Sequence, residues 1–147
     1  MAFHFQLAAL LRLRQSVERQ RTLQLQEANL HITRVKTKLA EVDQSLKDSA
    51  ETGETALHAG RTGAEIQFTL LVRENLQRMR LEFLSEISKL EVVRQKALLE
   101  YQKAYRDREM LETLRLRQRR VYQQEELRRQ QQELDAAYLL QRWHRRE

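Results

Sequence analysis

Apolar residues in the first third of the chain recur in alternating steps of three and four positions. A repeat of this kind, sustained over several turns, is the pattern of a coiled-coil seam, the narrow stripe that packs against one partner helix. The stripe extends toward the N-terminus with a phase slip near Arg21, so we expect one helix over about residues 3–50. The stripe comprises Phe3, Leu7, Leu10, Val17, Leu25, Ala28, Ile32, Val35, Leu39, Val42 and Leu46.

The three glycines of the chain all lie between positions 53 and 63, and the chain has no proline. Gly53 is suited to end a helix in the left-handed conformation, and Thr62 with Glu65 has capping-box spacing for a new helix. We therefore predict a turn over about residues 51–62. A second helix should follow over about residues 63–143, because strong helix formers continue there without a breaker.

A second apolar stripe follows the turn with the same spacing, and the two stripes can be matched to each other. If the chain folds back on itself, facing residues lie equally far from the centre of the turn. Leu46 then faces Phe68, and Leu10 faces Tyr105, with the turn centred near residues 57 and 58. The second stripe comprises Phe68, Val72, Leu76, Met79, Phe83, Ile87, Leu90, Leu98, Tyr101 and Tyr105.

The matched stripes predict an all-α fold, a single domain over residues 1–147 that forms a long antiparallel two-helix coiled-coil hairpin. In this register Arg21 faces Arg94, with Glu18 and Glu91 one turn away, so a polar layer is expected there. A parallel dimer of one continuous helix gives no reason for the two stripes to match.

The second helix is longer than the first and should overhang it at the C-terminus. With Phe3 opposite Glu112, the last ~35 residues have no partner within the chain, an overhang of about 50 Å at 1.5 Å per residue. Apolar residues on this otherwise charged helix imply a partner helix, a groove or a second copy. They are Leu114, Val121, Tyr122, Leu127, Leu134, Tyr138, Leu139, Leu140 and Trp143.

Charge and composition narrow the class of partner. The net charge is +6, but acidic and basic residues are interspersed, which does not favour nucleic acid as the main partner. The absence of cysteine suits a reducing compartment, and no apolar run approaches the ~20 residues of a membrane span. We expect a soluble, cytoplasmic protein without a transmembrane segment.

The residue types of catalysis and metal binding are present without the necessary clustering. His4, His31, His58 and His144 are far apart, and a two-helix hairpin offers no enclosed cavity in which paired carboxylates acquire shifted pKa values. We expect no catalytic residue, no metal, no cofactor and no small-molecule substrate. The protein is predicted not to be an enzyme.

Arginine is the sole basic residue type, histidine aside, in the C-terminal part of the chain beyond Lys103. Its planar fork suits bidentate contact with carboxylates of a protein partner, although a solvated charged face is an equal alternative. Tyr122, Tyr138 and Trp143 lie among these arginines, and aromatic residues with arginine are typical of interface hot spots. This mixture favours a partner site.

The opening Phe5-Gln6-Leu7-Ala8-Ala9-Leu10-Leu11-Arg12-Leu13-Arg14, followed by Val17-Glu18, resembles the start of the flagellar export protein FliJ family. The segment Ala104-Tyr105-Arg106-Asp107-Arg108-Glu109, with Leu111-Glu112, Leu114, Tyr122, Glu125-Glu126, Arg128-Arg129 and Leu134-Asp135, is similar to the C-terminal half of that family. The resemblance implies a non-catalytic component of the flagellar type III export apparatus. Its expected place is the cytoplasmic periphery of the inner membrane.

The resemblance also implies partners. A member of this family is expected to act as a stalk that binds a hexameric export ATPase and promotes assembly of its ring. It is further expected to link the ring to an export gate protein and to substrate chaperones. By that likeness, the ATPase-facing residues would be Phe3, Leu7, Leu10, Arg12, Arg14, Tyr122, Leu134 and Trp143. The gate-facing residues would be Leu39, Phe68, Leu71 and Leu76.

Two classes of alternative stay open at this point. One is the corresponding stalk of a virulence-type injectisome. The other needs no ATPase: a homodimeric structural coiled coil, or an amphipathic helix that binds an anionic membrane or nucleic acid.

Overall fold

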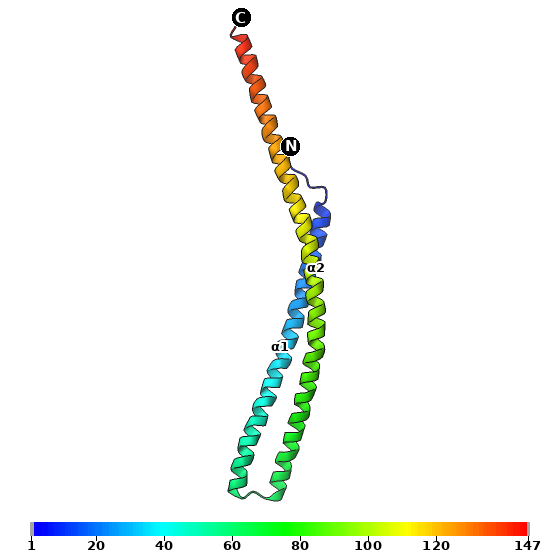
Figure 1. Ribbon diagram of the computed structural model, residues 1–147, viewed down its shortest axis with the longest axis vertical. Coiled ribbons are helices and arrows are strands. Elements are labelled where there is room, and N and C mark those ends of the chain that lie inside the picture. The colour runs from blue at the N-terminus through cyan, green and yellow to red at the C-terminus, as the bar shows by residue number, and fades with distance from the viewer. Residues whose placement is uncertain (1, 147) are drawn as a thin grey trace. The chain divides into compact units, whose positions relative to one another are not determined.

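The computed structural model describes residues 2–146, except the side chains of Ala56 and Leu57. It contains two helices, α1 (Ala8–Ala59, 52 residues) and α2 (Gly63–His144, 82 residues), which run antiparallel (Figure 1). The described residues contain no strand. The predicted all-α helical hairpin is therefore confirmed.

The two helices contribute to two compact units, which are described separately. The turn unit is Gln20–Gln102, and the terminal unit is Met1–Arg19 with Lys103–Glu147. The expectation of a single domain over the whole chain stays a prediction.

The turn of the turn unit is shorter and later than predicted. α1 continues through Gly53 to Ala59, and Gly60 adopts the left-handed conformation, with φ 70°. Gly53 therefore does not end the helix, and the predicted end near residue 50 is wrong. The reason is that Gly53 costs a helix only about 1 kcal/mol relative to Ala, which the surrounding helix formers tolerate.

The start of α2 agrees with its capping signal. Thr62 immediately precedes the first helical residue, Gly63, and its carbonyl accepts a hydrogen bond from the Ile66 N–H at 3.2 Å. Thr62 thus occupies the N-cap position, where its carbonyl starts the helical ladder.

The seam of the turn unit contains the predicted residues of α1. Ile32, Val35 and Val42 are buried, and the remaining stripe members between Leu25 and Leu46 are half-buried. From α2, half-buried Leu76, Met79, Phe83, Ile87 and Leu90 complete the seam. Phe68 and Val72 were also predicted to lie there but are exposed, Phe68 at 69%.

The register between the helices differs from the predicted one by about two turns. Arg80 donates to Asp43 at 2.8 Å, whereas the predicted register places Asp43 beside Leu71. The stripes repeat every seven residues, so sliding one helix by a heptad matches apolar residues almost equally well. With the turn centred on Arg61, Leu39 lies opposite Phe83 rather than Leu76.

The N-terminal segment of the terminal unit is not helical before Ala8, contrary to the predicted start near residue 3. Phe3 is half-buried and Phe5 is 5% exposed. Side chains two positions apart do not share a face of a helix, so covering both rings requires an irregular segment. Leu11 is buried at 3% exposed, while Leu7 and Leu10, predicted stripe members, are exposed.

Polar side chains occupy the seam where a phase slip was expected. Covered positions of α1 continue in seven-residue steps through Leu11, Glu18 and Leu25, so the slip near Arg21 is wrong. Within the terminal unit Arg14 pairs with Asp107 at 3.4 Å, and Arg108 pairs with Glu18.

The polar contacts extend into the turn unit, although not between the residues predicted. Arg21 donates to Glu100 at 2.8 Å instead of facing Arg94. Arg94 pairs with Glu91 of its own helix at 3.4 Å. We call the contacts of Arg14 and Glu18 in the terminal unit the polar seam.

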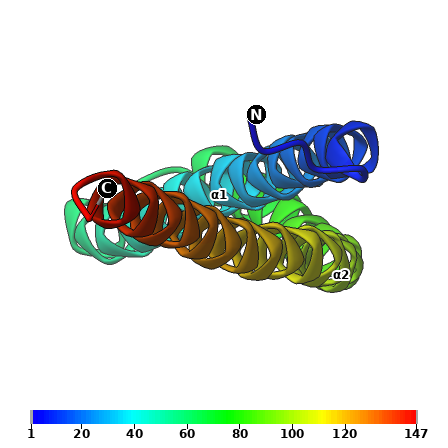
Figure 2. The ribbon, with the colours of Figure 1, turned by 90° about the horizontal axis from the view of Figure 1, so that it is seen from above.

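α2 extends past the last packed residue of the terminal unit, as predicted, but by less. Phe3 contacts Tyr122 rather than Glu112, because the register is shifted. From residue 123 to 146 every side chain except Glu126 is exposed. We call this stretch of the terminal unit the overhang (residues 123–146). Figure 1 shows α2 continuing past the N-terminal segment, and Figure 2 shows its C-terminal end from above.

Candidate partner-binding surfaces

A hollow of about 550 Å³ lies where the N-terminal segment meets α2 in the terminal unit. We call it the terminal hollow. Its floor is apolar and its rim is basic. It is lined by Phe3, Phe5, Ala8, Leu11, Arg12, Gln15, Arg115 and Arg119.

The hollow is shaped by the tight entry into α1. The Ala8 N–H donates to the Phe5 carbonyl at 3.1 Å, and the Leu11 N–H donates to the Leu7 carbonyl at 2.9 Å. This turn directs Phe5 inward. Phe3 lies against Tyr122, with ring centroids 5.6 Å apart and ring planes tilted by 48°, a favourable aromatic geometry. The two aromatic rings therefore anchor the N-terminal segment to α2.

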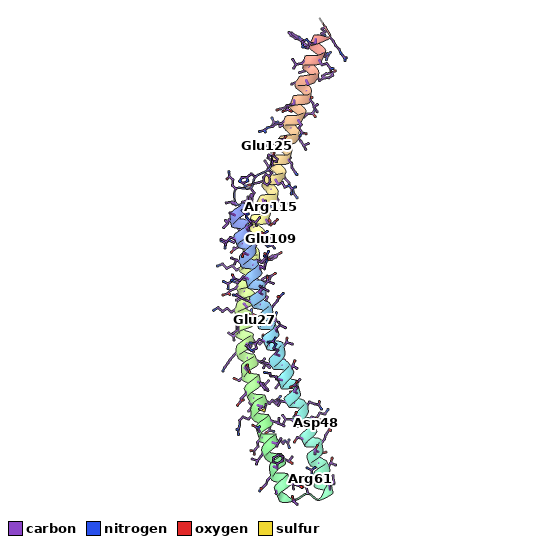
Figure 3. The ribbon with its side chains drawn as sticks, turned by 180° about the vertical axis from the view of Figure 1, so that it is seen from behind. Glu27, Asp48, Arg61, Glu109, Arg115 and Glu125 are labelled. Atoms are coloured by element: carbon purple, nitrogen blue, oxygen red, sulfur yellow. The ribbon has the colours of Figure 1, made fainter. Side chains whose placement is uncertain are left out.

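The rim of the terminal hollow concentrates positive charge. Arg115 pairs with Glu112 on its own helix at 3.2 Å. No ion pair engages Arg12 or Arg119 among residues 2–146. Figure 3 shows Arg115 on α2 beside the beginning of α1, with Glu125 farther along the same helix. The hollow is therefore electropositive on the sides that face solvent.

The polar seam holds the two helices of the terminal unit in register next to this hollow. The Glu18 and Arg108 side chains are only 18% and 22% exposed, and Arg108 also lies 5.1 Å from the centre of the Tyr105 ring. The hydrogen bond to Glu18 raises the pKa of Arg108, so the pair stays charged on the arginine side. An ion pair shielded in this way favours one register over its neighbours.

The overhang exposes large apolar side chains on opposite faces. At 100° per residue Leu127, Leu134 and Tyr138 share one face. Leu140 and Trp143 lie on the opposite face, and Trp143 is 70% exposed. A helix with apolar residues on two faces is not covered by one packed neighbour, so the overhang fits a site that surrounds it.

The residues predicted to face the ATPase are all in the terminal unit, but they do not form one patch. Phe3 contacts Tyr122, and Arg12 lines the same hollow. Arg14 is half-buried in the polar seam. Leu7, just before α1, and Leu10, on its first turn, are exposed, and Leu134 and Trp143 are exposed on the overhang.

Sequence reasoning missed Phe5, Leu11, Arg115 and Arg119 as parts of this surface. With a continuous helix from Phe3, the apolar stripe passes through Leu7 and Leu10 and leaves the missed residues outside it. The spacing of Phe3 and Phe5 is the signal that could have corrected it, since two aromatic residues at i,i+2 fit an extended segment packed on one helix.

The residues predicted to face the gate divide into two groups within the turn unit. Leu39 and Leu76 are half-buried in the seam, whereas Phe68 and Leu71 are exposed near the turn. A second hollow of about 310 Å³ lies close by, between the helices. It is lined by Ser49, Ala50, Gly53, Glu54, Arg61, Ile66, Thr69, Leu70 and Arg73.

Residues 2–146 contain neither a candidate metal site nor a candidate membrane span. No group of three or more His, Cys, Asp or Glu side chains is placed to hold a metal ion there. In the same part of the chain, neither helix contains a segment long and apolar enough to cross a membrane.

The sequence matches the family described as Flagellar FliJ protein over residues 3–147. The chain belongs to this family. FliJ membership makes it a protein associated with flagellar export, in a family of non-catalytic export components, with partners in the export apparatus. Comparisons with curated proteins and with solved structures found no match.

Proposed function

We propose that this FliJ family protein is a stalk of the flagellar type III export apparatus. In this proposal its terminal unit binds the hexameric export ATPase and promotes assembly of the ring. Its turn unit reaches the export gate protein, and the protein also engages substrate chaperones. It acts in the cytoplasm, at the periphery of the inner membrane.

The overhang is the observation that carries the ATPase part of this proposal. Leu127, Leu134 and Tyr138 on one face and Leu140 and Trp143 on the other are all more than half exposed. Burying side chains of this size contributes about 1.5–3 kcal/mol each, so they favour a partner that encloses the helix. The central opening of a ring encloses a helix in this way.

Charge supports the same partner class. Arg128, Arg129, Arg142, Arg145 and Arg146 lie on the overhang among the exposed apolar residues. A ring lined by carboxylates would pair with such guanidinium groups and steer the overhang into the opening. Because the faces of one helix differ, a single chain would contact the subunits of a ring unequally.

For the gate side, we propose Phe68 and Leu71 as the contacting residues. Both are exposed near the turn, at 69% and 63%. Leu39 and Leu76 would act through the seam, by holding the two helices of the turn unit together. Replacing Phe68 and Leu71 with Ala is expected to weaken binding to the purified gate protein without altering ATPase binding.

The test of the ATPase surface is binding of the full chain to the purified export ATPase by biolayer interferometry. The Leu134→Glu and Trp143→Glu double variant should bind at least about tenfold more weakly, because each introduces a carboxylate into the proposed contact. The matched control is Leu30→Glu with Leu81→Glu, which changes two exposed leucines of the turn unit. Equal binding by the two double variants would remove the overhang from the interface.

A further inference from the structure

The terminal hollow has the dimensions and lining of a docking site. Its volume of about 550 Å³ is in the range of ligand sites, and Phe5, Ala8 and Leu11 supply an apolar floor. Phe3 closes one side, because its ring is held against Tyr122. The hollow stays open to solvent between these residues and the arginines, so it can accept an apolar side chain from outside.

The arginines on the rim favour acidic groups next to the apolar side chain that enters the hollow. Arg115 and Arg119 are four residues apart on α2, about 6 Å along the helix, and Arg12 lies across the hollow on α1. Arg12 and Arg119 have no ion-pair partner within residues 2–146. Carboxylates of a bound segment would therefore meet two guanidinium groups, Arg12 on α1 and Arg119 on α2, that the chain itself leaves available.

The apolar floor favours a protein segment over other anions. A nucleic acid backbone carries no aliphatic group to fill the hollow, and a membrane surface presents no protruding side chain. A short acidic helix with leucine, isoleucine or phenylalanine between its carboxylates satisfies the floor and the rim together.

We propose that the terminal hollow binds a short acidic segment of a partner protein, with one apolar side chain on Phe5 and Leu11 and flanking carboxylates on Arg12 and Arg119. The inference rests on the proposed function in one respect, because it assigns a partner motif to the ATPase-facing end. It concerns the hollow, which is separate from the overhang.

The probe is a pair of short synthetic helical peptides with identical leucines, one with glutamates at i,i+4 spacing and one with glutamines in their place. Binding to the full chain is followed by fluorescence anisotropy. The glutamate peptide should bind at least about tenfold more tightly than the glutamine peptide. The Arg12→Gln and Arg119→Gln double variant should lose that difference.

Two variants separate docking in the hollow from general attraction to a basic protein. Arg34→Gln with Arg78→Gln removes the same charge from exposed positions of the turn unit and should leave peptide binding unchanged. Ala8→Leu fills the hollow without changing charge and should weaken binding at least about fivefold. Helical circular dichroism melts show that each variant remains folded.

Several outcomes would overturn the inference. They are equal binding of the two peptides, an equal loss in both arginine double variants, and tighter binding of duplex DNA or phosphatidylglycerol vesicles than of the glutamate peptide. Any of these with ATPase binding through the overhang intact would reject the hollow alone. Peptide binding by a chain that fails to bind the ATPase would instead reject the proposed function alone.

Discussion

At the scale of single residues, the most informative feature of this chain is the presence of charged side chains at seam positions. Glu18, Arg14 and Arg21 occupy places where a coiled coil normally has apolar residues, and each has an oppositely charged partner on the other helix. A partly shielded pair of this kind adds little net stability, but leaving one member unpaired is costly. Their effect is to disfavour registers in which the partners do not meet.

The first prediction concerns the most shielded of these pairs. Glu18→Gln leaves the charged Arg108 with only the more exposed Glu109 carboxylate, 3.4 Å away, so the free energy of unfolding should fall by about 1–2 kcal/mol, measured by urea denaturation. The raised pKa of Arg108 keeps its guanidinium charged, so this stabilisation is present from neutral pH up to the ordinary guanidinium pKa and should not vary near neutrality.

The control for that prediction is the exposed cross-helix pair of Lys36 and Glu91, 3.8 Å apart. Lys36→Gln should change the free energy of unfolding by less than about 0.5 kcal/mol, because exposed pairs are screened by solvent. A Glu18→Gln effect no larger than the Lys36→Gln effect would show that the polar seam does not contribute to register.

Glycine gives a second prediction at this scale, because Gly53 and Gly60, seven residues apart, differ in conformation. Gly53 is helical, and a methyl group added to its Cα would meet open space, so Gly53→Ala should raise the free energy of unfolding by about 0.5–1 kcal/mol. Gly60 has φ 70°, so Gly60→Ala should lower it by about 1 kcal/mol. Thermal melts of the two variants should therefore shift in opposite directions.

At the scale of elements, the sequence predicts the helices and the seam better than it predicts the register between the two helices. The stripe from Leu25 to Leu46 is the observed seam of α1, since burial in a two-helix hairpin requires that spacing. The register could not be read from the stripes, because a heptad slide returns apolar residues to apolar residues. It is selected by Gly60 and by the shielded ion pair of Glu18 with Arg108.

The candidate site likewise contains one part that the sequence predicts and one part that it does not. The exposed apolar residues of the overhang were predicted, because no opposite stripe exists to cover them. The terminal hollow was not, since it depends on the irregular segment that carries Phe3 and Phe5. Local periodicity indicates which residues need cover, whereas the entry angle of a non-helical segment depends on tertiary packing.

A cross-linking experiment tests the register directly, because the chain has no cysteine of its own. Leu39→Cys with Phe83→Cys should form a disulfide readily under mild oxidation, since these positions lie opposite each other across the seam. Leu39→Cys with Leu76→Cys places the second thiol about two turns away and should not cross-link within the chain. The two yields are compared by non-reducing electrophoresis, and preferential linkage of the second pair would contradict the register.

At the scale of the whole molecule, the residues that pack between the helices differ from those that are left exposed for a partner. Where α1 and α2 face each other, their apolar and charged residues mainly satisfy one another. Where α2 continues alone, Leu134, Tyr138 and Trp143 remain for a partner. In the proposed function, the export-apparatus partners would meet α2 as a continuous helix that extends beyond its packing with α1.

The central claim is that the overhang engages a hexameric export ATPase, and titration into that purified enzyme tests it most directly. Hydrolysis rate and ring assembly are followed for the full chain and for a chain ending at Tyr122. The account predicts stimulation that saturates near one full chain per ATPase hexamer and is lost on truncation. Absence of stimulation by the full chain, or equal stimulation by the truncated chain, would contradict it.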